Sequence, residues 1–415
     1  MDEILGFDEF EEQLKILAEF QSHLFYSLDC SDTVLKNERL KNVYQFLDEK
    51  DIQSNFAIYE GILNLIAHAS LIRSMNQYSP TILRKILKKL IKYHDLKNKI
   101  NQSTIFSIFM KSKVLLLFLL HKNVIDISLL LNEIRLKNQG KYFFEFFLPE
   151  TQKGDEFLFK SLLQKYINID DDIKKYYSDK EELYEWARYA GHSNDALAVH
   201  IISDDLKEFI SYIANSSTLK EFDYNAKLEL SPFEFNIDII NAYKSNTRQN
   251  AENSGLSLIE YAMAFGSINI FRFLWLQKAE IQKESLQYAI IGGNYEIIHI
   301  LEEESKYKFD ISDIHKSIEY HRNTITDYLL NSRNNINRSS YFQEYIKAHN
   351  YQYVYELLSS TTDLEKRKEY IGLIMNLIML KQYSCSFLLS QFVLQQNGIN
   401  VNGQSKIYII IYGFY

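Results

Sequence analysis

The sequence predicts an all-α protein in which a helical N-terminal domain precedes a solenoid of stacked helical pairs. A phrase recurs along residues 257–358 with a period of 27 or 28 residues, and such a period is typical of units that stack on their neighbours. Apolar residues make up 46% of the 415-residue chain, enough to build packed cores. With only 3 prolines and 13 glycines, the chain has few helix breakers, which favours helices over a many-turned β architecture.

Residues 1–180 are expected to form the helical N-terminal domain. Apolar residues at helical spacing predict its helices, over residues 10–26, 55–75, 79–93, 104–120 and 127–136. Pro80 stands at the start of the third of these, where its missing N–H group costs nothing. Pro149 marks a break, and the charged stretch 167–182 places the domain boundary near residue 180.

Residues 181–415 are expected to hold the repeat array. It is expected to begin with a degenerate helical pair at residues 196–213, which we call the worn pair, followed by an irregular insert at about 215–255. The clearest repeats follow at residues 257–358, and a fifth unit is expected at 377–389. The end of the array is expected to be degenerate or truncated. Residues 406–415 are β-branched and aromatic, where a solenoid normally carries a polar cap.

Three columns of residues define the repeat. They are Ala262, Ala289, Ser317 and Tyr345; Gly266, Gly293, His321 and His349; and Leu274, Leu301, Leu329 and Leu357. A small residue suits the contact between neighbouring helices, and glycine suits a helix end that turns through the left-handed conformation. Where histidine replaces glycine, Asn323 and Asn350 lie close by, and asparagine tolerates that conformation better than most residues. Each unit is therefore predicted to be a short helix, a tight turn and a second helix.

The columns resemble the ankyrin repeat. Ala262, Gly266 and Leu274 match its alanine, glycine and leucine positions, as do the equivalent residues of the next unit, and residues 397–402 resemble its hairpin phrase. The Thr-Pro-Leu-His start is missing, and the period is shorter than the ankyrin value of about 33, so hairpins between units are expected to be short or missing. The phrases are similar to those of a large ankyrin family of trichomonad-type protists, whose members carry a helical N-terminal region of unknown role. The resemblance implies a protein-interaction module and no known activity; an armadillo-like helical array is the alternative.

The composition and charge of the chain limit the classes of function that it could have. The net charge is −8, whereas a nucleic-acid binder usually shows a basic excess, so no nucleic-acid partner is expected. Two cysteines far apart in the sequence favour a reducing, cytoplasmic location. The acidic N-terminus lacks the pattern of a secretory signal. The longest apolar run, residues 114–120, is far short of the roughly 20 residues that a membrane helix needs.

No motif in the sequence predicts a catalytic, cofactor-binding or metal site, and we expect no enzymatic activity. The glycines at 292 and 293 lack the lysine and serine of a phosphate-binding loop and are expected at a helix turn. His299, His315, His321 and His349 could suggest a metal, but the repeat register already accounts for two of them as turn residues. Asp170, with two further aspartates after it, lacks the glycine and closing glutamate of a calcium loop.

The segment 81–93 forms a basic amphipathic helix with two interpretations. Its cationic residues are Arg84, Lys85, Lys88, Lys89 and Lys92. Packing by the apolar face, with the lysines in water, is the interpretation we favour. Peripheral association with an anionic membrane, or binding to a calmodulin-like partner, is the alternative.

We therefore expect a scaffold that binds a protein partner through the concave face and the loops of the solenoid. Extended solenoid surfaces bind through a few aromatic or arginine anchors. The candidate partner-binding residues are Gln277, Lys278, Glu280, Gln282, Lys283, Tyr295, Tyr307, Lys308, Asp310, Arg333, Asn335, Tyr351 and Tyr353.

Overall fold

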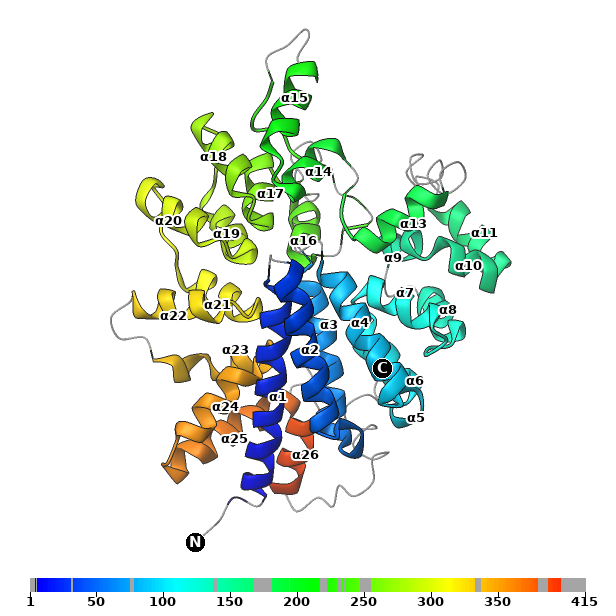
Figure 1. Ribbon diagram of the computed structural model, residues 1–415, viewed down its shortest axis with the longest axis vertical. Helices are drawn as coiled ribbons and strands as arrows, with labels where there is room; N and C mark the ends of the chain where they lie inside the picture. Colours follow the sequence, from blue (N-terminus) through cyan, green and yellow to red (C-terminus); the bar gives the residue numbers. More distant parts are fainter. Residues whose placement is uncertain are drawn as a thin grey trace. The chain divides into compact units, whose positions relative to one another are not determined.

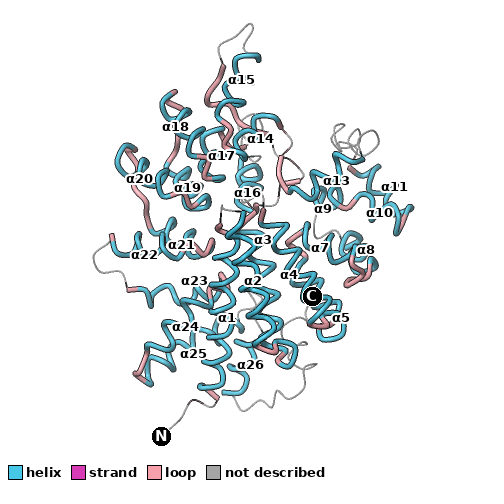
Figure 2. Tube along the Cα trace, viewed as in Figure 1, coloured by secondary structure: helices cyan, strands magenta, loops and turns pink. Residues whose placement is uncertain are grey.

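A computed structural model shows a chain built from helices and short loops. It describes residues 4, 6–30, 33–74, 78–136, 140–166, 181–193, 195–216, 222–229, 231, 233–234, 236–246, 255–332, 337–379 and 387–396. Across these residues Figure 2 shows helix and loop but no strand, and the one sheet-like feature printed for them is an antiparallel bridge between Lys227 and Ser257. The predicted all-α class is confirmed.

The chain divides into two compact units, each assembled from segments far apart in sequence. The first unit comprises residues 1–69, 85–100 and 310–415, and the second comprises 70–84 and 101–309. The predicted domain boundary near residue 180 falls beside residues 167–180, which lie outside the described ranges together with Asp170. That division of the chain stays a prediction.

The first unit combines N-terminal helices with the later helical pairs of the repeat. Its helices, with α3 and α4 divided between the two units, are α1 (Phe7–Leu28), α2 (Thr33–Glu49), α3 (Phe56–Ile72), α4 (Ser79–Tyr93), α5 (Leu96–Lys99), α21 (Ile311–Glu319), α22 (Asn323–Asn331), α23 (Phe342–Lys347), α24 (Tyr351–Ser360), α25 (Leu364–Met379) and α26 (Phe387–Gln396). Helix α21 packs on α22 and α23, and α23 packs on α24 and α25. The long helix α1 packs along α24 and also contacts α2 and α26 (Figure 1).

The second unit contains the earlier helical pairs. Its helices are α6 (Gln102–Phe109), α7 (Lys113–His121), α8 (Ile127–Leu136), α9 (Gly140–Phe146), α10 (Leu148–Gly154), α11 (Glu156–Lys165), α13 (Glu181–Ala190), α14 (Ala196–Ser203), α15 (Leu206–Ser216), α16 (Ile237–Asn246), α17 (Leu258–Phe265), α18 (Ile268–Leu276), α19 (Leu286–Gly292) and α20 (Tyr295–Glu304). Helix α17 lies between α14 and α19, and α18 lies between α15 and α20. Three consecutive pairs therefore stand side by side, first helix against first helix and second against second (Figure 1).

The predicted helix over residues 104–120 is wrong in one respect, because the segment forms two helices. The chain leaves the helical course at Ser112, whose N–H group donates to the Phe109 carbonyl at 2.8 Å. Its hydroxyl is 2.6 Å from that of Ser70. Helix α7 is apolar on nearly all sides, and six of its residues are buried. The break at Ser112 allows the second unit to enclose this helix. The expected break at Pro149 is confirmed, since this residue lies in the first turn of α10.

The clearest repeats form the predicted helical pairs. Each of the four clearest units is a short helix, a turn and a second helix, and the worn pair is present as α14 and α15. The insert holds the ten-residue helix α16. The predicted fifth unit at 377–389 overlaps only the end of α25 and the start of α26, and these two helices pack together. Its turn at 380–386, the hairpin phrase at 397–402 and the tail at 406–415 lie outside the described residues.

Candidate interaction surface

Each of the four clearest helical pairs turns through one residue in the left-handed conformation, as the sequence predicts. Gly266 and Gly293 have φ values of 68° and 70°, and His321 and His349 have values of 48° and 52°. Asp204, between α14 and α15, has a φ of 52° and extends the column to the worn pair. Glycine adopts this region without a steric cost, whereas a side chain there must be held by its surroundings.

Side chains beside these turns connect one pair to the next. In the first unit His321 and His349 themselves adopt the left-handed conformation. The nearby asparagines, Asn323 and Asn350, form hydrogen bonds between neighbouring pairs. The Asn350 amide donates to the Asn323 side-chain oxygen at 2.9 Å, and the ring of His321 has Nε2 2.6 Å from the Ala348 carbonyl. In the second unit the Ser267 hydroxyl donates to a carbonyl of α14 at 2.5 Å.

Close backbone packing adds to these links at Gly292. A Cβ atom there would overlap the carbonyl oxygen of Met263 and lie 2.9 Å from the Gly266 nitrogen. Helix α19 therefore approaches the end of α17 at a distance that only glycine allows. This role of Gly292 is distinct from that of Gly293, which supplies the turn.

Helices α17 and α19, the first helices of the two clearest pairs in the second unit, are covered along their length. No residue of α17 or α19 is exposed. The Tyr261 hydroxyl donates to Glu234 of the insert at 3.3 Å. Burial raises the pKa of the Tyr288 hydroxyl, and the charges of Glu260 and Asp238 raise it further. Because Glu234 and Asp238 belong to the insert, the chain itself occupies part of this face.

In the first unit, α1 occupies the turns of the later pairs. The Gln21 amide donates to the side chain of Asn350 at 2.8 Å, and its oxygen accepts from the Gln352 N–H group at 3.2 Å. The Phe25 ring lies 4.8 Å from the His321 ring, centroid to centroid. These side chains are therefore satisfied within the first unit.

Three of the four candidate tyrosines lie on helices, and they differ in exposure. Tyr351 and Tyr353 are 1% and 2% exposed and pack inside the first unit. The Tyr353 hydroxyl donates to Asp327 at 2.7 Å. Tyr295 is 58% exposed at the start of α20 and is the one of the three that faces solvent.

The loops that join one pair to the next carry most of the other predicted residues. Gln277, Lys278, Glu280, Gln282 and Lys308 are exposed, whereas Lys283, Tyr307 and Asp310 are half-buried, and Arg333 and Asn335 lie outside the described residues. The Glu280 N–H group donates to the side chain of Asn225 at 2.8 Å. The Lys283 ammonium donates to the Lys308 carbonyl. The structure thus brings the loops of consecutive second-unit pairs together in a row.

The second helices add a polar and apolar surface that the sequence reasoning missed. The Trp275 indole donates to Glu304 at 2.8 Å, and Arg272 pairs with Glu296, each bond joining α18 to α20. Leu276 is 77% exposed. It follows the exposed Arg272 by four residues and so shares the solvent face of α18. An apolar residue on that face is the signal that could have identified it.

A buried ionic network lies elsewhere in the second unit, at α7, α10 and α13. Arg188 is fully buried and pairs with Glu150 at 2.7 Å and with Glu185 at 2.6 Å. His121 lies 3.5 Å from Glu150 and 2.9 Å from the Tyr189 hydroxyl. Burial opposes ionisation of Glu150, but the hydrogen bond from His121 and the charge of Arg188 outweigh it and lower the pKa of this carboxyl. The network holds three helices together.

The four histidines considered at first for metal binding have different neighbours, and His321 and His349 both lie beside the ring of His68. His299 pairs with Glu303 on the exposed face of α20 at 3.3 Å, and the ring of His315 packs edge-on against Tyr341. Within the described ranges, no group of three or more histidine, cysteine, aspartate or glutamate residues is arranged to hold a metal ion.

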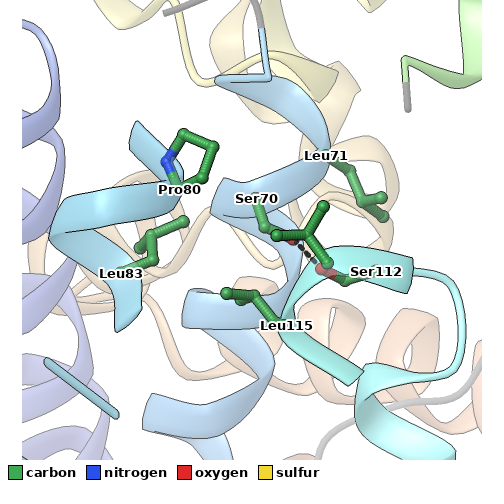
Figure 3. Close-up of a pocket in the computed structure, with 7 residues that line it drawn as sticks. Ser70, Leu71, Pro80, Leu83, Ser112 and Leu115 are labelled. Carbon is green, nitrogen blue, oxygen red and sulfur yellow. Dashed lines mark hydrogen bonds between the residues drawn. The ribbon is translucent and has the colours of Figure 1, made fainter. Parts of the chain in front are cut away.

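A small pocket in the second unit has a mostly apolar lining (Figure 3). Leu71, Pro80, Leu83 and Leu115 surround the hydrogen-bonded hydroxyls of Ser70 and Ser112, with Val114 completing the lining. The space open to a water-sized sphere is about 10 Å³, roughly what one water molecule requires. Ligand pockets begin at about 300 Å³, so this one is too small for a cofactor.

The basic helix α4 packs by its apolar face. Ile86, Leu87 and Leu90 are fully buried, while Lys85 and Lys88 are exposed. Among the residues that the structure describes, no helix has both the length and the apolar character to cross a bilayer.

Comparison with known proteins adds one finding. A family model described as "Domain of unknown function (DUF3447)" matches residues 276–357. The match runs from the end of α18 into α24 and so falls within the repeat columns. No curated protein and no solved structure matches the chain.

Proposed function

We propose that this chain is a protein-binding scaffold built on an ankyrin-like solenoid with short hairpins. The recurring left-handed turn, the side-by-side order of consecutive pairs within each unit and the hydrogen bonds between turns support the solenoid. A stacked array of this kind offers an extended surface whose residues repeat at fixed intervals, which suits an elongated protein partner.

The observation that carries the proposal is the row of exposed loops in the second unit. Lys278 and Glu280 lie in one loop and Lys308 in the next. Bonds to Asn225 and from Lys283 tie the loops to their neighbours. A surface fixed before binding loses less conformational entropy when a partner docks.

The docking surface that we propose is therefore the loop row together with the exposed side of α18 and α20. Leu276 and Tyr295 supply apolar area beside the charged loops, which is the combination of anchor and polar rim that protein interfaces use. The first helices α17 and α19 are buried, so a partner reaches the concave side only where the loops border it.

Proximity labelling in the native cell tests this proposal with two matched variants. The loop variant carries Lys278→Glu, Glu280→Lys and Lys308→Glu. The control carries Lys122→Glu, Lys153→Glu and Glu156→Lys, which change the same charges at exposed positions directly after α7, in α10 and in α11. We expect the loop variant to lose a set of labelled proteins that the wild type and the control retain. Equal labelling by all three chains would contradict the proposed surface.

A further inference from the structure

Helices α4 and α5 carry five exposed lysines in the first unit. We call Lys85, Lys88, Lys92, Lys97 and Lys99 the lysine ridge; all five are exposed. The first three are spaced so that they share one face of α4 and span roughly 10 Å along its axis. None of the five pairs with a carboxylate of the described residues, whereas the neighbouring Lys89 bonds to Asp48 at 2.7 Å.

The ridge is held rigidly because the opposite face of α4 is part of the core. Ile86, Leu87 and Leu90 are fully buried, so the helix cannot turn its apolar side to another surface without unfolding the first unit. Whatever binds here meets ammonium groups and the stems of lysine side chains. The ridge is therefore an electrostatic docking face and not an inserting amphipathic helix.

Tyr93 follows Lys92 in the sequence, and the positive charges of nearby lysines act on its hydroxyl. Tyr93 is 60% exposed. A hydrogen bond from Lys92 and the positive charges of Lys92, Lys89 and Lys88 lower the pKa of its hydroxyl. An exposed tyrosine next to lysines presents an apolar ring with a polar tip, a combination that suits the boundary between lipid headgroups and water.

The chemistry of the ridge distinguishes among anionic partners. It contains lysine only, since Arg84 is half-buried with its guanidinium over the ring of Tyr189. Protein interfaces are enriched in arginine and depleted in lysine, because the guanidinium fork binds carboxylates in a fixed geometry. Lysine is a mobile point charge that suits a surface of diffuse negative charge. Clusters of four to eight basic residues of this kind are typical of proteins that bind anionic lipids.

We propose that the lysine ridge docks the protein reversibly on an anionic lipid surface, without insertion into the bilayer. The net charge of −8 does not prevent this, because charges more than about 10 Å from the surface are screened at physiological salt. The ridge lies in the first unit and the loop row in the second, so this inference does not depend on the proposed protein-binding function.

Co-sedimentation of the full chain with vesicles tests the inference. We expect binding to vesicles that contain about one-third phosphatidylserine, weak binding to pure phosphatidylcholine, and loss of binding as salt rises. The variant Lys85→Glu, Lys88→Glu, Lys92→Glu should lower the partition coefficient by at least roughly a hundredfold. The control Lys122→Glu, Lys153→Glu, Lys207→Glu has the same net charge and exposed positions, and it should bind nearly as the wild type does.

Three results would overturn the inference. The first is failure of the wild type to bind the anionic vesicles at low salt. The second is an equal loss in both variants, which would assign binding to net charge alone. The third is ridge-dependent capture of a polyglutamate peptide with no capture of vesicles, which would assign the ridge to an acidic protein. A glutamine version of the ridge variant, melting at the wild-type temperature, excludes unfolding as the cause of a loss.

Discussion

The side-chain amide of Asn294 donates to the main-chain carbonyl of Gly266, 28 residues earlier, at 3.0 Å. The oxygen of the same amide accepts from the N–H groups of Glu296 and Ile297 and so caps the start of α20. One residue thus begins the second helix of its own pair and ties that pair to the one before. A bond of this kind fixes how far one unit is displaced from the next, which is what a constant period requires.

Replacing Asn294 separates these two functions. Asn294→Ala loses the cap and the link, and we expect it to lower the free energy of unfolding by about 2 kcal/mol. Asn294→Asp keeps an oxygen for the cap but has no donor for Gly266, and it should cost about 1 kcal/mol. Urea denaturation measures both. No loss of stability in the aspartate variant would show that the link contributes nothing.

Substitution at Gly292 tests the close approach of α19 to α17. Gly292→Ala places a methyl group against the Met263 carbonyl, and we expect a loss of roughly 2–3 kcal/mol from overpacking. Gly372→Ala is the matched control, because no atom lies within 4 Å of a Cβ at that position in α25. The control should be neutral or stabilising by about 0.5–1 kcal/mol, since alanine favours helix. If neither substitution changed the free energy of unfolding, the close approach of α19 to α17 would be refuted.

Gly293 is the test of the turn itself. Gly293→Val should destabilise the chain by about 1 kcal/mol or more, because a β-branched residue is poor at a φ of 70°. Gly293→Asn should cost less, since asparagine tolerates the left-handed region. Thermal unfolding of the three chains gives the order, and an unchanged melting temperature for the valine variant would count against this backbone conformation.

Acid should weaken the network around Glu150. Its pKa is lowered in the folded chain, so its ionised form stabilises the fold above the ordinary value near 4.5 and that contribution is lost as pH falls through the folded pKa. At pH 7, Glu150→Gln should cost about 3 kcal/mol because buried Arg188 loses a charged partner. As pH falls below about 4.5 and through the folded pKa of Glu150, the stability of the wild type approaches that of the variant. The gap between their urea midpoints measures this, and a gap independent of pH would contradict it.

Features that repeat were predictable from the sequence. The columns that begin with Ala262 and Gly266 predicted the helix-turn-helix unit, its turn residue and its buried contacts. They did so because each unit packs against its neighbours in the same way. The candidate loops at 277–283 and 307–311 followed from the same register.

Features that occur once were not predictable in this way. Gln21 contacts Asn350 across 329 residues of chain, and Glu234 meets Tyr261 from an insert without periodicity. Neither contact leaves a pattern in a single sequence. For this reason the burial of Tyr351 and Tyr353, and the covering of α17 and α19, could be learned only from the fold.

Hydrogen–deuterium exchange on the full chain, with and without the partner identified by proximity labelling, tests the proposed scaffold most directly. We predict that the partner slows exchange in the loops at 277–283 and 305–310 and in the adjoining turns of α18 and α20. Helices α17 and α19 should already exchange slowly in the free chain, because they are buried. Protection by the partner confined to residues outside these loops and helices would contradict the proposed docking surface.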